Sequence, residues 1–149
     1  MADSAVTYRY GQGKSADREY VAGGFHPVVK KIMYLMNIDN NLKFNACFLN
    51  RYDNQQNHLG WHADDSVEMD INHPIAVISF GAEREIWWKD KDYRGVVPQS
   101  NRQLLQNGSL FIMPAGFQRL YVHRIPKADR DVGMRISLTY RHYLTGAKK

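Results

Sequence analysis

The stretch from Arg135 to Arg141, RISLTYR, decides the fold and the site that we expect for this chain. Successive side chains of a β-strand point to opposite faces, so this run places its apolar residues on one face and both arginines on the other. The spacing alone leaves open whether the arginine face is solvated or points inward. Inward guanidinium groups are costly unless they meet anions, and Arg binds carboxylates in a planar fork. An inward arginine face therefore predicts a dicarboxylate ligand.

Short apolar runs separated by turn residues fill most of the remaining chain. Pro27 begins a predicted helix whose apolar residues recur at helical spacing up to Met36, and we expect Asn37 to Asn40 to end it. A predicted strand over residues 5–10 precedes the helix. The strands predicted after it cover residues 44–52, 75–80, 84–89, 102–105, 108–113, 120–125 and 134–143. This order predicts a mainly β (α+β) fold, a jelly roll with one N-terminal helix packed on it.

The composition is that of one folded domain covering residues 1–149. Hydrophobic residues make up 44% and charged residues 23%, which excludes the disordered class. The net charge of +5 favours polyanionic partners, although many small basic enzymes never bind nucleic acid. Cys47 is the only cysteine, so no intrachain disulfide can form. With no apolar run of membrane-spanning length, we expect an intracellular protein, cytoplasmic or in a eukaryote nuclear, that contacts no membrane.

His62 and Asp64 are separated by one residue, which is a spacing that suits metal binding. In extended backbone, two such residues point to the same face and can reach one ion. His123, after a hydrophobic run, is the best candidate for a third ligand. Two imidazoles and one carboxylate leave positions open for a co-substrate and dioxygen, as in non-haem Fe(II) oxygenases. A lone pair of this kind is more often a surface turn, and the arginine stretch is what favours the metal site.

Several short motifs occur in one order along the chain. They are Asn50-Arg51-Tyr52, His62-Ala63-Asp64-Asp65, Pro74-Ile75-Ala76, Ser79-Phe80-Gly81-Ala82, Gly108-Ser109-Leu110, His123-Arg124-Ile125-Pro126 and the Arg135–Arg141 stretch. Together they resemble the AlkB-type Fe(II)/2-oxoglutarate dioxygenases, the family of oxidative nucleobase dealkylation. The similarity is greatest to the branch of eukaryotic DNA-repair homologues. No motif is decisive alone, but the combination is highly specific and spans nearly the whole chain.

The resemblance implies a double-stranded β-helix fold and assigns roles to individual residues. It implies that His62, Asp64 and His123 are both the metal ligands and the catalytic centre. It matches Arg135 with the arginine that pairs with the distal carboxylate of 2-oxoglutarate, and Arg141 with the arginine near the 2-oxo acid end. The full set that it implies for 2-oxoglutarate is Asn50, Tyr52, Arg135 and Arg141.

The resemblance also implies a reaction and a substrate. We expect an oxidoreductase that uses Fe(II), 2-oxoglutarate and O2, releases succinate, and demethylates nucleobases of the 1-methyladenine or 3-methylcytosine type in DNA or RNA. The target base has to leave its stack and lie between flat side chains. Tyr8 and Tyr10 match the family's aromatic lid positions, although they could instead belong to a packed edge strand. Asp65 could accept a hydrogen bond from an exocyclic amine of the base.

Two departures from the family pattern bear on the substrate. Ser66 stands where the DNA-repair branch often carries a carboxylate, and the chain begins close to the lid strand, without a duplex-probing extension. The missing extension leads us to expect action on single-stranded DNA or RNA, and Ser66 weakens the assignment of the base. We also expect a monomer. Two alternatives stay open. One is the same chemistry on an unmodified base or a protein side chain. The other is a catalytically silent nucleic-acid-binding module, which the intact metal triad and arginine pair argue against.

Overall fold

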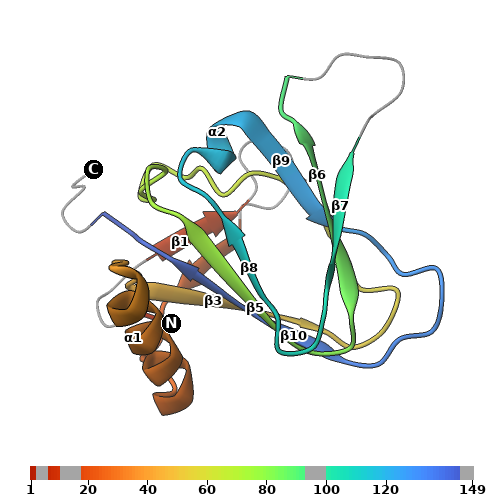
Figure 1. The fold of residues 1–149 in the computed structure, drawn as a ribbon, viewed down its shortest axis with the longest axis horizontal. Coiled ribbons are helices and arrows are strands. Elements are labelled where there is room, and N and C mark those ends of the chain that lie inside the picture. Colours follow the sequence, from red (N-terminus) through yellow and green to blue (C-terminus); the bar gives the residue numbers. More distant parts are fainter. Residues whose placement is uncertain (3–6, 11–17, 93–99, 145–149) are drawn as a thin grey trace.

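The structure is a computed structural model, and it describes residues 1–2, 7–10, 18–92 and 100–144 (Figure 1). For residues 7–10 and 18–20 it describes the backbone alone. One four-stranded sheet consists of β3 (Ala46–Tyr52), β5 (Ile75–Gly81), β8 (Leu110–Met113) and β10 (Arg135–Arg141). A second consists of β4 (Leu59–His62), β6 (Arg84–Asp90), β7 (Asn101–Leu105) and β9 (Tyr121–Ile125). The remaining elements are β1 (Thr7–Tyr10), β2 (Arg18–Val21), α1 (Pro27–Asn40) and α2 (Phe117–Leu120).

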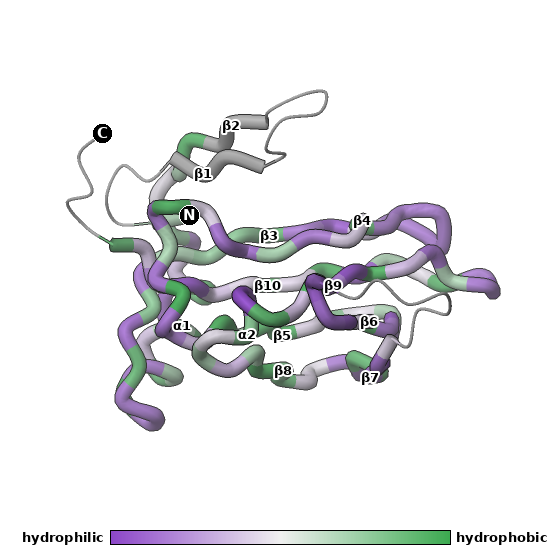
Figure 2. Tube along the Cα trace, turned by 90° about the horizontal axis from the view of Figure 1, so that it is seen from above, coloured by the Kyte–Doolittle hydropathy of each residue, from purple (hydrophilic) through white to green (hydrophobic). Residues whose placement is uncertain are grey.

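The two large sheets form the jelly roll. Their strand orders are β3-β10-β5-β8 and β4-β9-β6-β7, and every pairing is antiparallel. Figure 2 shows both orders from above, with α1 at one end of the sheets. β1 pairs only with β2, in a separate two-stranded sheet. The predicted fold class, a jelly roll with one N-terminal helix, is therefore confirmed.

β10 is an inner strand of its sheet, and its two faces are lined by different kinds of side chain. It pairs along its length with β3 on one side and β5 on the other. Its apolar residues Leu138 and Tyr140 pack against the buried face of α1, and the Tyr140 hydroxyl donates to the Val29 carbonyl at 3.0 Å. Its arginines point the other way, between the sheets, where Arg135 and Arg141 are buried. The inward alternative for the arginine face is the one that the structure adopts.

α1 is longer than the sequence predicts. The helix continues through Asn37 to Asn40 and ends at Asn41, which adopts left-handed backbone with φ 52°. Asn37 does not break it because its side-chain amide bonds forward: Nδ2 donates to the Phe44 carbonyl, and Oδ1 accepts from the Phe44 N–H, both at 2.9 Å. The asparagine thus connects the helix to the following loop. Neither this helix nor α2, the two that the structure describes, has the length and apolar character to span a membrane.

β4 and α2, two elements that shape the site, were not predicted, and neither was β2. β4 has only four residues, LGWH, and at the sheet edge it pairs with β9 alone across a bulge. Such a run is too short to show a periodic pattern. The predicted strand over 120–125 starts one residue later, because Leu120 ends α2. The other predicted strands are confirmed with ends shifted by one or two residues, apart from residues 5 and 6, which lie outside the described residues.

We predict that Gly81→Ala destabilises the domain more than Gly108→Ala. Both glycines have positive φ, +86° and +75°, so alanine is strained at either position. A Cβ on Gly81 would lie 2.3 Å from the Met134 carbonyl oxygen, whereas one on Gly108 meets nothing within 4 Å. In urea unfolding, Gly108→Ala should cost about 1 kcal/mol and Gly81→Ala at least about 3 kcal/mol. Equal losses would show that the close approach to Met134 does not matter.

Candidate metal centre

Three side chains from two separate segments of the sequence meet between the sheets. Ligand atoms of His62, Asp64 and His123 all lie within 4.8 Å of one another. His62 is the last residue of β4 and stands directly opposite His123 of β9. Asp64 lies two residues beyond the end of β4, so it reaches the cluster from a loop rather than from the strand. The spacing argument thus predicts the right trio, although its premise of a continuous strand through Asp64 does not hold.

The His62 ring is oriented by its own strand. Its Nδ1 lies 2.8 Å from the Gly60 carbonyl oxygen. A carbonyl can only accept, so Nδ1 carries the proton and Nε2 keeps its lone pair. Nε2 lies 3.9 Å from Oδ1 of Asp64. A histidine held in this tautomer by a backbone carbonyl is the usual preparation of an imidazole ligand.

The Asp64 carboxylate is held from two directions. Arg141 Nη2 donates to its Oδ2 at 2.7 Å, and the Asp64 N–H donates to Oε1 of Gln118 at 2.9 Å. Burial alone would raise the pKa of Asp64, but the charge of Arg141 and the neighbouring His62 and His123 lower it to about 2. The carboxylate is therefore ionised at neutral pH. With Oδ2 engaged by Arg141, Oδ1 is the oxygen that faces His62.

His123 supplies a neutral, buried imidazole. Burial, followed by the nearby His62, lowers its pKa to about 3. Its ring centroid is 4.2 Å from that of His62. Within the described part of the chain, its Nδ1 is buried and makes no hydrogen bond. Two neutral imidazoles and one carboxylate are the donor set of the non-haem Fe(II) oxygenases, so the residues present fit this metal.

A cavity beside the triad contains the predicted co-substrate residues. Arg135 is 1% exposed, and its Nη2 donates to the Ser79 hydroxyl at 2.9 Å. Its Nε and Nη1 are buried without a hydrogen-bond partner among the described residues, and its Cζ lies 5.1 Å from the ring centroid of Tyr52. Burial lowers the pKa of Arg135. Buried donors with no acceptor fit a carboxylate ligand. The polar lining comprises Asn50, Tyr52, His62, Asp64, His123, Arg135, Ser137, Thr139 and Arg141.

The cavity is small in this conformation. Its volume is about 30 Å³, which is room for about two water molecules. A five-carbon dicarboxylate therefore enters only after lining side chains move apart.

Of the three predicted substrate residues, only Asp65 has a described side chain. Asp65 does not line the cavity; its side chain is 43% exposed, and its Oδ2 accepts from Lys91 Nζ at 2.5 Å. The side chains of Tyr8 and Tyr10 lie outside the described residues, although the backbone of both belongs to β1. The structure thus brings together all of the residues predicted for the metal and 2-oxoglutarate.

Two residues that stabilise the site through hydrogen bonds to nearby backbone groups, Gln118 and Arg84, were not predicted from the sequence. Gln118 of α2 is 54 positions from Asp64, yet it is the side chain that holds the Asp64 N–H. Arg84, 3% exposed, donates to the carbonyl oxygens of Asn57 and Pro126, at 2.9 and 2.5 Å, and lies over the Tyr52 ring at 5.6 Å. These hydrogen bonds go to backbone groups, of Asp64, Asn57 and Pro126, rather than to side chains. No spacing of residues in the sequence predicts such contacts.

Comparison with known proteins gives a consistent set of relatives. The chain is 28% identical over 151 residues to the DNA oxidative demethylase ALKBH2 of Bos taurus, covering 99% of this chain and 52% of that protein. It is 30% identical over 124 residues to the alpha-ketoglutarate-dependent dioxygenase alkB homolog 3 of Homo sapiens, covering 78% of this chain and 43% of that protein. It thus spans about half the length of these curated relatives.

The fold and the family agree with these relatives. The solved structure of OsALKBH1 superposes with a TM-score of 0.54 at 18% identity, over 77% of this chain and 60% of that one, which is a likeness of fold. The family model of the 2OG-Fe(II) oxygenase superfamily matches residues 2–141, which include the triad and both arginines of β10. The chain belongs to the 2OG-Fe(II) oxygenase superfamily, as an AlkB-like member.

Proposed function

We propose that this chain catalyses the oxidative demethylation of N-alkylated nucleobases of the 1-methyladenine or 3-methylcytosine type, coupled to decarboxylation of 2-oxoglutarate to succinate. One observation carries the proposal. The His62–Asp64–His123 cluster lines the same cavity as Arg135, whose Nε and Nη1 are buried with no hydrogen-bond partner among the described residues. A metal site beside a buried dicarboxylate site is what this reaction requires.

In this proposal, His62, Asp64 and His123 hold Fe(II). When bound, the iron with 2-oxoglutarate and O2 supplies the oxidising power that hydroxylates a C–H bond of an N-methyl group, after which the methyl leaves as formaldehyde. The protein's own part is to fix the ligands. The Gly60 carbonyl keeps the His62 lone pair on Nε2, and Arg141 keeps Asp64 ionised and turned toward the histidines.

We assign the co-substrate to the arginine face of β10. Arg135 pairs with the distal carboxylate, because its free donors are buried and a planar fork suits that group. Arg141 lies at the metal end, bonded to Asp64, and is therefore beside the 2-oxo acid. Asn50 and Tyr52 line the same cavity from β3 and complete the polar contacts.

For the substrate, we propose a strand of nucleic acid, DNA or RNA, that is single-stranded at the target base. The relatives named as DNA oxidative demethylases support a nucleobase, and the net charge of +5 supports a polyanion. Tyr8 and Tyr10 stay the proposed walls for the flipped base, and Asp65 the proposed acceptor for its exocyclic amine. For this, Asp65 has to break its ion pair with Lys91 and accept a hydrogen bond from the base instead.

A second candidate keeps the dioxygenase chemistry and changes the substrate to an unmodified base or a protein side chain. The ion pair of Asp65 with Lys91 favours it, because an engaged carboxylate offers less to a methylated base. Succinate release that is stimulated by an unmethylated substrate would favour this candidate over the first.

The test of the function is turnover on oligonucleotides that carry 1-methyladenine or 3-methylcytosine. With Fe(II) and 2-oxoglutarate, the wild-type chain should release formaldehyde and succinate in equal amounts. Asp64→Asn should abolish both products and Mn(II) binding by calorimetry, since a neutral amide is a poor ligand for a hard cation. His62→Ala should do the same without touching the buried ion pair. Asp65→Asn is the matched control and should keep Mn(II) binding while raising KM for the oligonucleotide.

These outcomes separate the proposals. Unchanged Mn(II) affinity in Asp64→Asn and His62→Ala would contradict the metal assignment. Intact metal binding with no turnover on any methylated DNA or RNA would reject the nucleobase and leave the metal site standing.

Arg135→Met should weaken 2-oxoglutarate selectively. Methionine keeps much of the buried volume but loses the charge-assisted hydrogen bonds, so KM for 2-oxoglutarate should rise about tenfold or more while Mn(II) affinity stays the same. Arg51→Met is the control on the neighbouring strand β3, because Arg51 is exposed and bonds Asp53 instead. An unchanged KM for 2-oxoglutarate in Arg135→Met would remove Arg135 from the co-substrate site.

A further inference from the structure

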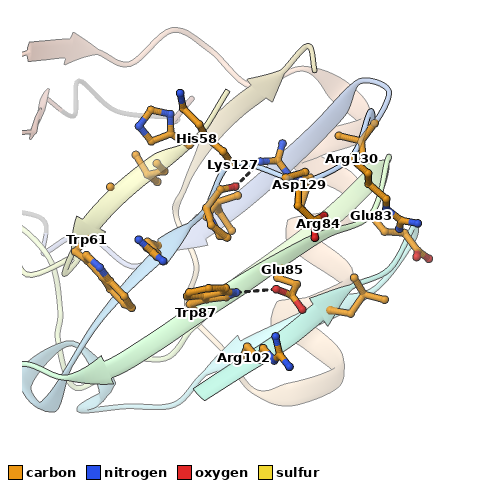
Figure 3. Close-up of a pocket in the computed structure, with 18 residues that line it drawn as sticks. His58, Trp61, Glu83, Arg84, Glu85, Trp87, Arg102, Lys127, Asp129 and Arg130 are labelled. Carbon is orange, nitrogen blue, oxygen red and sulfur yellow. Dashed lines mark hydrogen bonds between the residues drawn. The ribbon is translucent and has the colours of Figure 1, made fainter. Parts of the chain in front are cut away.

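The outer face of the β4-β9-β6-β7 sheet carries a row in which tryptophan and arginine alternate. Trp87 of β6 stands opposite Arg124 of β9 on one side and Arg102 of β7 on the other. Trp61 of β4 precedes His62, which pairs with His123, so Trp61 stands beside Arg124. The row thus crosses all four strands, about 14 Å at the usual strand spacing. Figure 3 shows Trp61, Trp87 and Arg102 on this face.

The middle of the row is a cation held between two indole rings. Cζ of Arg124 lies 4.7 Å from the ring centroid of Trp61 and 4.4 Å from that of Trp87. Lys89 Nζ lies 4.9 Å from the ring centroid of Trp61. The guanidinium group of Arg124 thus contacts both indole rings, and its Nε is buried with no hydrogen-bond partner among the described residues, which leaves the Nη groups as the donors for a ligand.

The charges of the row lack counter-ions. Across the described ranges, no ion pair joins Arg102, Arg124 or Lys89 to an acid. Glu85, two residues before Trp87 on β6, accepts a hydrogen bond from Trp87 Nε1 at 2.8 Å. This carboxylate therefore orients the indole ring and does not pair with an arginine of the row. Guanidinium groups without carboxylates on a half-exposed surface are suited to phosphate.

A groove lies over part of this row. It has a volume of about 1070 Å³ and is lined by Trp61, Trp87, Arg102 and Arg124 among others. Its lining holds five Lys or Arg and three Glu or Asp, a surplus of positive charge. The metal ligands are not in it, because side chains alternate along β4 and β9 and the histidines point to the other face.

We propose that this row binds a segment of single-stranded nucleic acid outside the catalytic cavity. The guanidinium edges of Arg102 and Arg124 hold phosphates, and Trp87 stacks a base; aromatic side chains between cations are how sequence-independent single-strand sites are built. The inference rests on the proposed function in taking nucleic acid as the substrate. The row ends at Trp61 on the edge strand β4, one residue before His62, whose side chain points to the other face of the sheet.

Fluorescence anisotropy with an unmodified single-stranded oligonucleotide of about 20 nucleotides tests the row directly. Trp87→Ala, Arg124→Ala and Arg102→Ala should each raise Kd about fivefold or more. The slope of log Kd against log salt should become shallower by about 0.7 for each arginine removed, and should not change in Trp87→Ala. Trp87→Phe keeps an aromatic ring and should recover most of the lost affinity.

Matched controls come from α1, away from this sheet. Tyr34→Ala and Lys31→Ala remove one exposed aromatic ring and one exposed cation there, and should leave Kd unchanged. Mn(II) affinity at the triad is measured in every variant. The Mn(II) affinity should equal the wild-type value. A lower affinity would mean that the substitution displaces β4 rather than removing only a contact of the row.

Turnover distinguishes the row from the catalytic proposal. On a methylated trinucleotide, which has almost no flanking strand, the row variants should retain wild-type rates; on the long methylated strand their KM should rise with kcat unchanged.

Unchanged Kd for the long strand in Arg124→Ala and Trp87→Ala overturns the row, whether or not the enzyme turns over. If the same variants bind the oligonucleotide as the wild type does but bind Mn(II) more weakly, the row only holds β4 in place, and the proposal is also overturned. If the expected Kd changes occur but no methylated oligonucleotide is turned over, demethylation is rejected and the row remains a binding site for nucleic acid.

Discussion

The buried ion pair between Arg141 and Asp64 joins the two sheets at the point where the chemistry is proposed. Arg141 ends the central strand of one sheet, and Asp64 follows the edge strand of the other. The two side chains are 5% and 1% exposed, with the nitrogen and oxygen 2.7 Å apart. A buried pair of this kind is stabilising only when it is well bonded, and losing either partner leaves a costly buried charge. The same bond orients the carboxylate toward both histidines.

Charge balance explains why this centre requires ligands. Arg135 and Arg141 contribute two positive charges and Asp64 one negative charge, while His123 is held neutral. An uncompensated charge inside a protein is unfavourable. A metal cation would increase the positive excess, and a dicarboxylate would offset it, so the two are expected to bind more strongly together than apart. In this account, metal and co-substrate depend on each other through the arginine face of β10.

Strand alternation gives the second sheet two different faces. On β4 and β9, His62 and His123 point toward the cavity, and their neighbours Trp61 and Arg124 stack on the outer face. Because β4 is an edge strand with few pairings, the stack on its outer face is also one of the contacts that hold it in place. Metal affinity measured in variants of the outer face therefore distinguishes a loss of the stack alone from a displacement of β4.

Much of this arrangement could be predicted, and the exceptions have physical causes. Alternation in RISLTYR predicts the central strand and its arginine face, and ordered motifs predict the triad. The helix end at Asn37 was wrong because a side-chain amide bonding to Phe44 outweighs a poor helix propensity. β4 was missed because four residues show no period. Gln118 could not be predicted, since its contact is with a backbone N–H far away in sequence. The roles of Tyr8, Tyr10 and Asp65 stay predictions.

Anomalous diffraction from crystals grown with Mn(II) and 2-oxoglutarate is the most direct measurement of the central claim. The account predicts one strong anomalous peak per chain, coordinated by His62, Asp64 and His123. It also predicts 2-oxoglutarate bound to that ion, with its far carboxylate against Arg135. A metal coordinated elsewhere, or a 2-oxoglutarate molecule that does not touch both the ion and Arg135, would contradict the account.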